Sequence, residues 1–318
     1  MPSDATTSTF PANIATDAQM TPAQIVSAAL ERIVAGYVFP QRAVEIDAAI
    51  RNRIDAGEYD EVSGAAFCER VTAHLQEVCG DKHLRLLWQD EPRAPEAPDD
   101  DGRADFLALM RAENQGIRRV EQLDGNIGLL EIRRIADAAI GGRAIGAAME
   151  LVAHTRALIL DLRECRGGYP SGANLWSSFF FPDDEVHLND IYERSTDSTR
   201  QYWTVAHLPA PRYPEDRPVY VLTSEVTFSG GEDVAYTLQA HGRATVVGET
   251  TRGGAHPTAR HPVTAHITVT VPTARSINAV TGTNWEGVGV IPDLAAPAGQ
   301  ALEAAHRKAL EETESREA

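Results

Sequence analysis

Apolar residues recur every three to four positions along the first quarter of the chain, a spacing that predicts amphipathic helices. Three helices are expected, over residues 22–36, 40–57 and 63–80. Thr21 followed by proline, with Gln24 three residues later, is typical of a helix start. The pattern therefore predicts a small helical bundle over residues 21–88, preceded by a tail, residues 1–20, that we expect to be disordered.

From residue 125 onward, short β-rich runs alternate with helical spacing. The expected strands are residues 126–132, 157–162 and 218–223, and the expected helices are residues 140–155, 172–181 and 232–241. This alternation predicts an α/β core over residues 125–318, with a helix at its C-terminal end. Residues 89–124, which include prolines and a run of acidic residues, are expected to connect the bundle to the core.

Composition narrows the class of protein. The chain has 318 residues, 43% of them hydrophobic, which is enough for a sizeable core. A formal net charge of -17 argues against nucleic acid or an anionic membrane as the main partner. The three cysteines, Cys68, Cys79 and Cys165, show no metal-ligand spacing and are expected to be reduced thiols. No apolar run is long enough for a transmembrane helix, and residues 1–20 do not resemble a signal peptide, so we expect a cytoplasmic protein.

Ser229 is the candidate nucleophile. It lies where the strand over residues 218–223 has ended and the helix over residues 232–241 is about to begin. A hydroxyl at such a junction faces free backbone N–H groups and the positive end of the helix dipole, which would stabilise an oxyanion. The pattern Ser229-Gly-Gly-Glu232 also fits a capping box, in which the serine only accepts a hydrogen bond from the helix. This segment alone favours the cap, because capping serines are far more numerous.

Four ordered blocks resemble the tail-specific, or C-terminal processing, serine peptidases. They are DKHL (residues 81–84), LILDLRECRGG (158–168), TFSGGEDVAY with RATVVGETTRGGAHP (227–257), and NWEGVGVIPD (284–293). The sequence GYVFP at residues 36–40 resembles the branch named for interphotoreceptor retinoid-binding protein. The resemblance covers residues 21–310. It implies a core with the spiral of strands and helices found in ClpP and crotonase, and residues 85–125 are too few for the PDZ domain that many members insert.

The resemblance also implies which residues would activate Ser229. Classical members use a lysine, but its position is occupied here by Gly254. The tricorn protease instead uses a histidine and a glutamate, and this chain has His83 and Glu286 at those positions. The tricorn pattern places a serine directly before its histidine, whereas this chain has Lys82, so the network that orients the base differs. His256, close to the vacated lysine position, is a rival base or a substrate-binding residue.

Further site residues follow from the same blocks. Gly230, together with Gly167 or Gly168, is expected to supply the N–H groups of an oxyanion hole. Arg163 and Arg166 could bind a peptide carboxylate, although arginines near turns more often form structural salt bridges.

The sequence therefore predicts a serine peptidase that acts on peptides or proteins through an acyl-enzyme and needs no metal or organic cofactor. Two alternatives remain at this point. One is a non-catalytic carrier of retinoid or fatty acid, because the namesake of the branch is a carrier. The other is acyl transfer or hydrolysis on a small molecule, because fold does not determine function.

Overall fold

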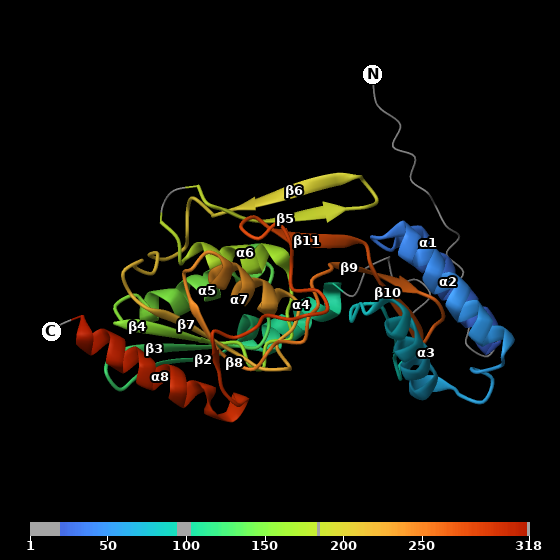
Figure 1. Cartoon of the computed structure of the whole chain (residues 1–318), viewed down its shortest axis with the longest axis horizontal. Helices are drawn as coiled ribbons and strands as arrows, with labels where there is room; N and C mark the ends of the chain where they lie inside the picture. The colour runs from blue at the N-terminus through green and yellow to red at the C-terminus, as the bar shows by residue number, and fades with distance from the viewer. Residues whose placement is uncertain (1–19, 94–102, 183–184, 317–318) are drawn as a thin grey trace, which may run out of the picture. The chain divides into compact units, whose positions relative to one another are not determined.

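The computed structural model describes residues 20–93, 103–182 and 185–316 (Figure 1). These residues form two compact units, and each has a hydrophobic core of its own. No helix in the described ranges combines the length and the apolar character needed to cross a bilayer. The two units are described separately.

The smaller unit contains the three expected helices, α1 (Pro22–Gly36), α2 (Pro40–Asp55) and α3 (Gly64–Cys79). The N-terminus of α1 is a capping box, as predicted. The Gln24 N–H donates to the Thr21 hydroxyl at 3.3 Å, and the Thr21 N–H donates to the Gln24 side chain at 2.8 Å. The apolar faces of the three helices share one core.

A three-stranded antiparallel sheet completes the smaller unit, in the order β1 (Arg85–Trp88), β10 (Ile267–Pro272), β9 (Thr258–Pro262). Leu86 of β1 lies opposite Val269 of β10, and both are buried in the core of the helices. Residues 259–271 thus belong to this unit, which the expected boundary at residue 88 did not include. A four-residue strand is not stable alone, and its partner here lies far along the sequence.

The larger unit is built on a six-stranded sheet. Its strand order is β12 (Leu294–Ala295), β8 (Thr245–Gly248), β7 (Val219–Thr223), β4 (Ala157–Asp161), β3 (Ile127–Ile132), β2 (Ile117–Leu123). Strands β3, β4, β7 and β8 are parallel neighbours, and β2 runs antiparallel to β3 at the edge. Every residue of β4 and β7 is buried, as expected for parallel strands covered on both faces.

Helices cover both faces of this sheet (Figure 1). Three helices, α5 (Ala138–Val152), α6 (Pro170–Ser178) and α7 (Gly230–Ala240), share a core with Leu158 and Leu160 of β4. The C-terminal helix α8 (Ala298–Ser315) packs through alanines on the opposite face, against Ile159. The predicted mixed α/β core, preceded by N-terminal helices, is confirmed.

Two parts of the larger unit differ from the sequence-based expectation. Residues expected to be a connection form α4 (Arg103–Ala112) and the edge strand β2. A register shift between Ile117 and Arg119 interrupts the alternation of β2, so its pattern does not indicate a strand. A second antiparallel sheet, in the order β11 (Ala274–Asn278), β5 (His187–Glu193), β6 (Ser198–Trp203), was not anticipated.

The parallel strands determine where a site can form. Because β3, β4, β7 and β8 point the same way, the segments that follow them emerge at one edge of the sheet. These segments are residues 133–137, 162–169, 224–229 and 249–257. Ser229, the glycine turn and the loop with Gly254 are therefore brought to the same edge.

Candidate functional site

Ser229 has a backbone conformation that an ordinary helix cap does not use. Its φ is 53° and its ψ is -120°, whereas Thr21, which caps α1, has φ -74° and ψ 158°. A positive φ is sterically unfavourable for a residue with a Cβ, and such positions cost about 1–3 kcal/mol. This conformation turns the chain sharply between β7 and α7 and leaves Ser229 partly exposed. It resembles the strained strand-to-helix turn that presents nucleophilic serines in hydrolases.

Ser229 and Glu232 face each other as in the predicted capping box, with one clear hydrogen bond between them. The Ser229 N–H donates to Glu232 Oε2 at 2.7 Å. The Ser229 hydroxyl faces the N–H of Glu232, but the contact does not reach hydrogen-bond geometry. The glutamate therefore holds the serine backbone, while the hydroxyl is not committed to the helix.

Glu232 connects Ser229 to the loop that follows β8. Its side chain is fully buried. Besides Ser229, its carboxylate accepts hydrogen bonds from the Thr251 hydroxyl at 2.5 Å, Gly253 N–H at 2.6 Å and Gly254 N–H at 3.0 Å. Burial raises the pKa of the Glu232 carboxyl, and these donors oppose the rise because they favour the ionised form. The sequence analysis treated Glu232 only as a capping residue and missed its role as the anchor of the loop.

His83 occupies the space beside Gly254, the position that holds a lysine in classical relatives. Its ring stacks on Phe228, the neighbour of Ser229, with ring centroids 4.4 Å apart and an interplanar angle of 26°. A Cβ on Gly254 would overlap the Phe228 ring and lie 2.7 Å from His83 Cε1. The structure thus brings His83 to the serine turn, and the absence of a side chain at residue 254 is what makes room for its ring.

The glycine turn after β4 lies against Ser229. Gly167 has φ +86°, and a Cβ there would lie 2.7 Å from Ser229 Cβ. A Cβ on Gly230 would lie 3.2 Å from Gly168 N. Gly230 begins α7, so its N–H has no acceptor within the helix, and the Gly168 N–H makes no backbone hydrogen bond to the described residues. The N–H groups of Gly168 and Gly230 therefore lie in neighbouring segments beside Ser229, and an oxyanion hole formed by them stays a prediction.

A cluster of ionisable side chains surrounds His83. Asp81 Oδ1 accepts from the His83 backbone N–H at 3.0 Å, and Asp81 Oδ2 lies 2.7 Å from His256 Nδ1. Glu286 Oε2 accepts from the Ala255 N–H at 2.5 Å and lies 3.4 Å from His256 Nδ1. Asp81, His83 and Glu286 each place a ligand-type atom within 4.8 Å of the others. Both Asp81 oxygens accept hydrogen bonds, so this carboxylate is held between the His83 backbone and the His256 ring.

The pKa values in this cluster are shifted in different directions. Burial raises the pKa of Glu286 to about 7, and the nearby Asp81 charge adds to the rise. Burial is the largest influence on the pKa of His256 and lowers it, but the hydrogen bond to Asp81 and the charges of Asp81 and Glu286 together outweigh burial, so that pKa is raised. Burial opposes ionisation of Asp81 as well, yet its hydrogen bonds and charge interactions with His256 and His83 together lower its pKa overall. Asp81 and His256 therefore favour a charged pair, with a partly protonated Glu286 beside it.

Asp81 was not identified from the sequence as a site residue, because 175 residues separate it from His256. Lys82, the departure from the tricorn pattern, donates a hydrogen bond from Nζ to the Arg252 carbonyl. Lys82 therefore helps to hold the loop after β8.

The two arginines of the glycine-turn block have different surroundings. Arg163 donates to both oxygens of Asp161, at 2.8 and 2.6 Å, and to the Ala298 carbonyl at 2.6 Å. These contacts connect the end of β4 to the start of α8. They give Arg163 the structural role that was considered as the alternative to substrate binding. Arg166 is exposed. Substrate binding by either arginine stays a prediction.

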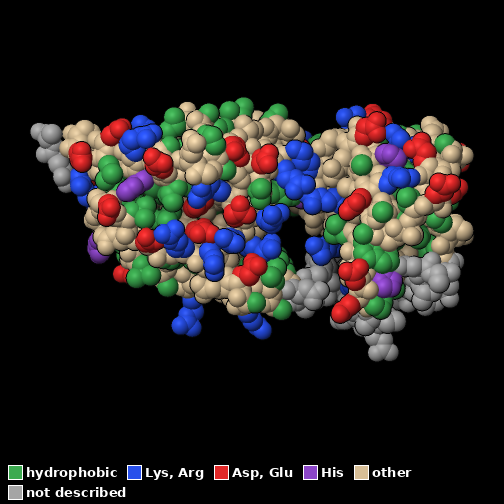
Figure 2. All heavy atoms as spheres, turned by 90° about the horizontal axis from the view of Figure 1, so that it is seen from below, with side chains coloured by type: hydrophobic (Ala, Val, Ile, Leu, Met, Phe, Trp, Pro, Cys, Tyr) green, Lys and Arg blue, Asp and Glu red, His purple; other side chains and the backbone are tan. Residues whose placement is uncertain are grey.

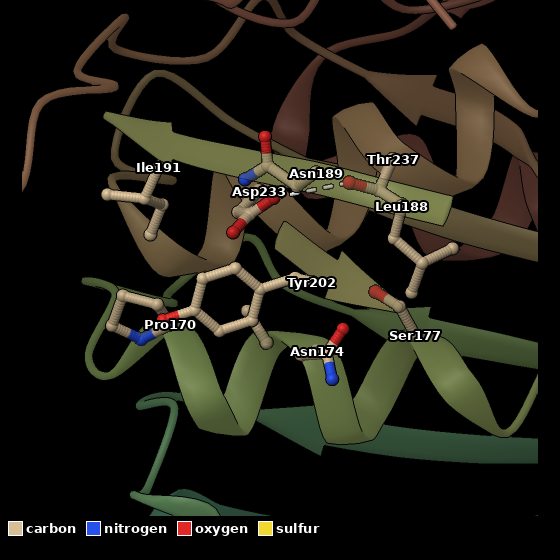
Figure 3. A pocket seen from close by; sticks show the side chains of 10 residues that line it. Pro170, Asn174, Ser177, Leu188, Asn189, Ile191, Tyr202, Asp233 and Thr237 are labelled. Carbon is tan, nitrogen blue, oxygen red and sulfur yellow. Dashed lines mark hydrogen bonds between the residues drawn. The ribbon is translucent and has the colours of Figure 1, made fainter. Parts of the chain in front are cut away.

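A small cavity also lies between α6, α7 and the strands β5 and β6 (Figure 3). Its lining includes Asp233 and Thr237 of α7 and Tyr202 of β6, and the Thr237 hydroxyl donates to Asp233 at 3.2 Å. Burial raises the pKa of Asp233 to about 7. A volume of about 10 Å³ holds roughly one water molecule, so this cavity does not accommodate a peptide.

Solved structures with this fold include several proteases. The photosystem II D1 C-terminal processing protease is 14% identical over 92% of this chain and 98% of its own, with a TM-score of 0.53. The tricorn protease is 14% identical over 92% of this chain and 37% of its own, with a TM-score of 0.58. A lipoprotein from Streptococcus agalactiae is 13% identical over 92% of this chain and 97% of its own, with a TM-score of 0.58. At these identities the likeness shows the fold alone.

Two family models together match most of the chain. Residues 14–120 match the N-terminal domain of peptidase S41 in eukaryotic IRBP, which agrees with the branch indicated by the sequence. Residues 126–296, which contain Ser229, Gly254, His256 and Glu286, match peptidase family S41. The predicted resemblance is thereby confirmed: the chain belongs to peptidase family S41 and is a serine peptidase.

Proposed function

We propose that this peptidase cleaves peptide bonds through an acyl-enzyme formed on Ser229, with His83 as the general base. The observation that carries the proposal is the conformation of Ser229. A positive φ at a serine costs free energy that a cap does not require, so the capping contact with Glu232 does not account for this conformation. Strain of this kind persists where the surrounding structure enforces it, and here Glu232 does so.

The first half of the reaction forms the acyl-enzyme. Ser229 Oγ attacks the scissile carbonyl carbon while His83 accepts the hydroxyl proton. The negative charge then resides on the former carbonyl oxygen, where the N–H groups of Gly168 and Gly230 stabilise it. When the tetrahedral intermediate collapses, the C–N bond breaks and His83 returns the proton to the leaving amine.

The second half releases the acid product. A water molecule attacks the acyl carbon, His83 accepts a water proton, and collapse of the second intermediate breaks the ester bond and reprotonates Ser229. During both halves, the negative charge of Asp81, and that of Glu286 when it is ionised, stabilise the imidazolium form of His83. We assign Glu286 this electrostatic role, and Asp81 the additional role of holding the His83 backbone through the hydrogen bond at 3.0 Å.

The substrate class is peptide or protein. The carrier alternative is disfavoured because the matching family is a peptidase family. We also propose that the protein acts in the cytoplasm, with a core of the ClpP and crotonase type and without a metal or organic cofactor. In support of that location, Cys68, Cys79 and Cys165 are not joined by disulfide bonds, as is usual in a reducing compartment.

Replacing Ser229 should separate catalysis from stability. Ser229→Ala should lower kcat by about a thousandfold or more and abolish labelling by a fluorophosphonate probe. Ser229→Gly should be equally inactive but melt no lower than the parent, because glycine relieves the strain of the positive φ. Thr21→Ala, at an ordinary cap, is the control: it should keep activity and lose about 1 kcal/mol of stability. An active Ser229→Ala variant with a lowered melting temperature would show that Ser229 is only a cap.

The two histidines should differ in kinetics. We expect His83→Ala to slow acylation by about a hundredfold or more, because it removes the general base. His256→Ala leaves the carboxylate of Asp81 buried without its histidine partner, so it should mainly lower the melting temperature. Acylation can be followed as the rate of fluorophosphonate labelling at a fixed pH. If labelling stops in His256→Ala and proceeds normally in His83→Ala, the base is His256.

Gly254 can be tested by adding a single methyl group. Gly254→Ala should displace the His83 ring, because its Cβ would lie 2.7 Å from His83 Cε1, and kcat/KM should fall by at least about tenfold. Gly299→Ala is a matched control, since a Cβ at Gly299 meets no atom within 4 Å. Steady-state kinetics on both variants measure the difference. Unchanged activity in Gly254→Ala would show that catalysis does not need the His83 ring in its position beside residue 254.

The raised pKa of Glu286 predicts how stability depends on pH. The folded state binds this proton more tightly than the unfolded state, so stability should fall as pH rises from about 4.5 to about 7. Glu286→Gln removes this titration and should flatten the fall, as measured by melting temperature at closely spaced pH values. Glu303→Gln, at an exposed position of α8, should leave the profile unchanged. An equally steep profile in Glu286→Gln would contradict the shift.

A further inference from the structure

A cleft beside the proposed oxyanion turn is lined by arginine. It lies between the end of α4, the start of β2 and the segment that follows β3, and its volume is about 330 Å³. Its lining includes Glu113, Arg118 and Arg133. Two further arginines lie next to Arg133. Arg134 follows it in the sequence, and the Arg166 N–H donates to the Arg133 carbonyl at 3.0 Å.

Some of these charges are neutralised and others are not. Arg133 pairs with Glu131 at 2.9 Å, and Arg134 pairs with Glu113 at 2.9 Å. Arg118 and Arg166 are both exposed, and neither forms an ion pair with a residue that the structure describes. The surroundings of the cleft therefore have an excess of positive charge, although the whole chain carries a formal charge of -17.

Backbone hydrogen bonds connect this cleft to the catalytic edge of the sheet. The Ile135 N–H donates to the Gly167 carbonyl at 2.9 Å, only two residues after Arg133. Gly167 in turn lies against Ser229, since a Cβ there would be 2.7 Å from Ser229 Cβ. A peptide bound at Ser229 can thus extend from the glycine turn into the cleft without leaving this edge.

We propose that the cleft binds side-chain carboxylates of an acidic peptide and so makes acidic segments the preferred substrates. The proposal rests on the function assigned above. A single C-terminal carboxylate is satisfied by one bidentate arginine, whereas Arg118 lines the cleft and Arg166 follows Arg133 through a backbone hydrogen bond, so two arginines without an ion pair to a described residue suit more than one carboxylate. Figure 2 shows several Lys and Arg side chains close together on the surface of the larger unit. A region with an excess of positive charge lets an acidic peptide approach a protein whose overall charge is strongly negative.

Peptide binding can be measured without turnover in the full-length Ser229→Ala protein. The probes are two fluorescein-labelled peptides, one with several glutamates and one with glutamine at the same positions, each made with a free and with an amidated C-terminus. Fluorescence anisotropy gives the dissociation constants. We expect the glutamate peptide to bind about tenfold more tightly in both C-terminal forms, and this preference to shrink at high salt.

Arg118→Gln combined with Arg166→Gln should remove most of that preference and leave the glutamine peptide unaffected. The control combines Arg143→Gln with Arg307→Gln, which changes net charge equally at exposed positions of α5 and α8 and should leave the preference intact. The proposal is overturned by equal binding of the two peptides, by an equal loss in the control, or by a preference confined to free C-termini. Fluorophosphonate labelling of the parent tests the nucleophile separately, so the two proposals can fail independently.

Discussion

The catalytic edge of this protein depends on one buried carboxylate. Glu232 accepts hydrogen bonds from the N–H of Ser229 at the start of α7 and from Gly254 in the loop after β8. The first contact holds the serine in a conformation that is otherwise unfavourable, and the second fixes the loop that lies beside His83. A carboxylate buried this deeply is tolerated only with several donors. Ser229, the proposed nucleophile, and the loop beside His83, the proposed base, are therefore held by the same group.

The elements around this group were predictable because they obey local rules. The buried runs of β4 and β7 and the helical spacing of α7 specify strand, strand and helix without reference to the rest of the chain. The capping pattern of Ser229 and Glu232 likewise indicated where α7 begins. It could not reveal the positive φ of Ser229, because that angle is imposed by contacts with Gly167 and by Glu232 rather than by serine itself.

Features that depend on distant partners were not predictable from local pattern. Strand β1 is stabilised by β10, which follows it by about 180 residues in the sequence, so the smaller unit could not be bounded correctly. His83 and Glu286 were found only through family resemblance, and Asp81, which joins them to His256, was missed. A single aspartate has no spacing that marks it, and its importance comes from a contact made only in the folded chain.

The same cluster gives a physical reason for histidine rather than lysine as the base. Carboxylates raise the pKa of any nearby cation, and Asp81 and Glu286 are both close to His83. A lysine begins near a pKa of about 10.4 and must be lowered by several units to accept a proton at neutral pH, which these carboxylates would oppose. An imidazole begins near about 6.5, so it is a usable base at neutral pH without such a lowering. Gly254 and the two carboxylates thus favour the same base. The glycine makes room for the His83 ring, and the acidic surroundings suit an imidazole that becomes positively charged during the proposed reaction.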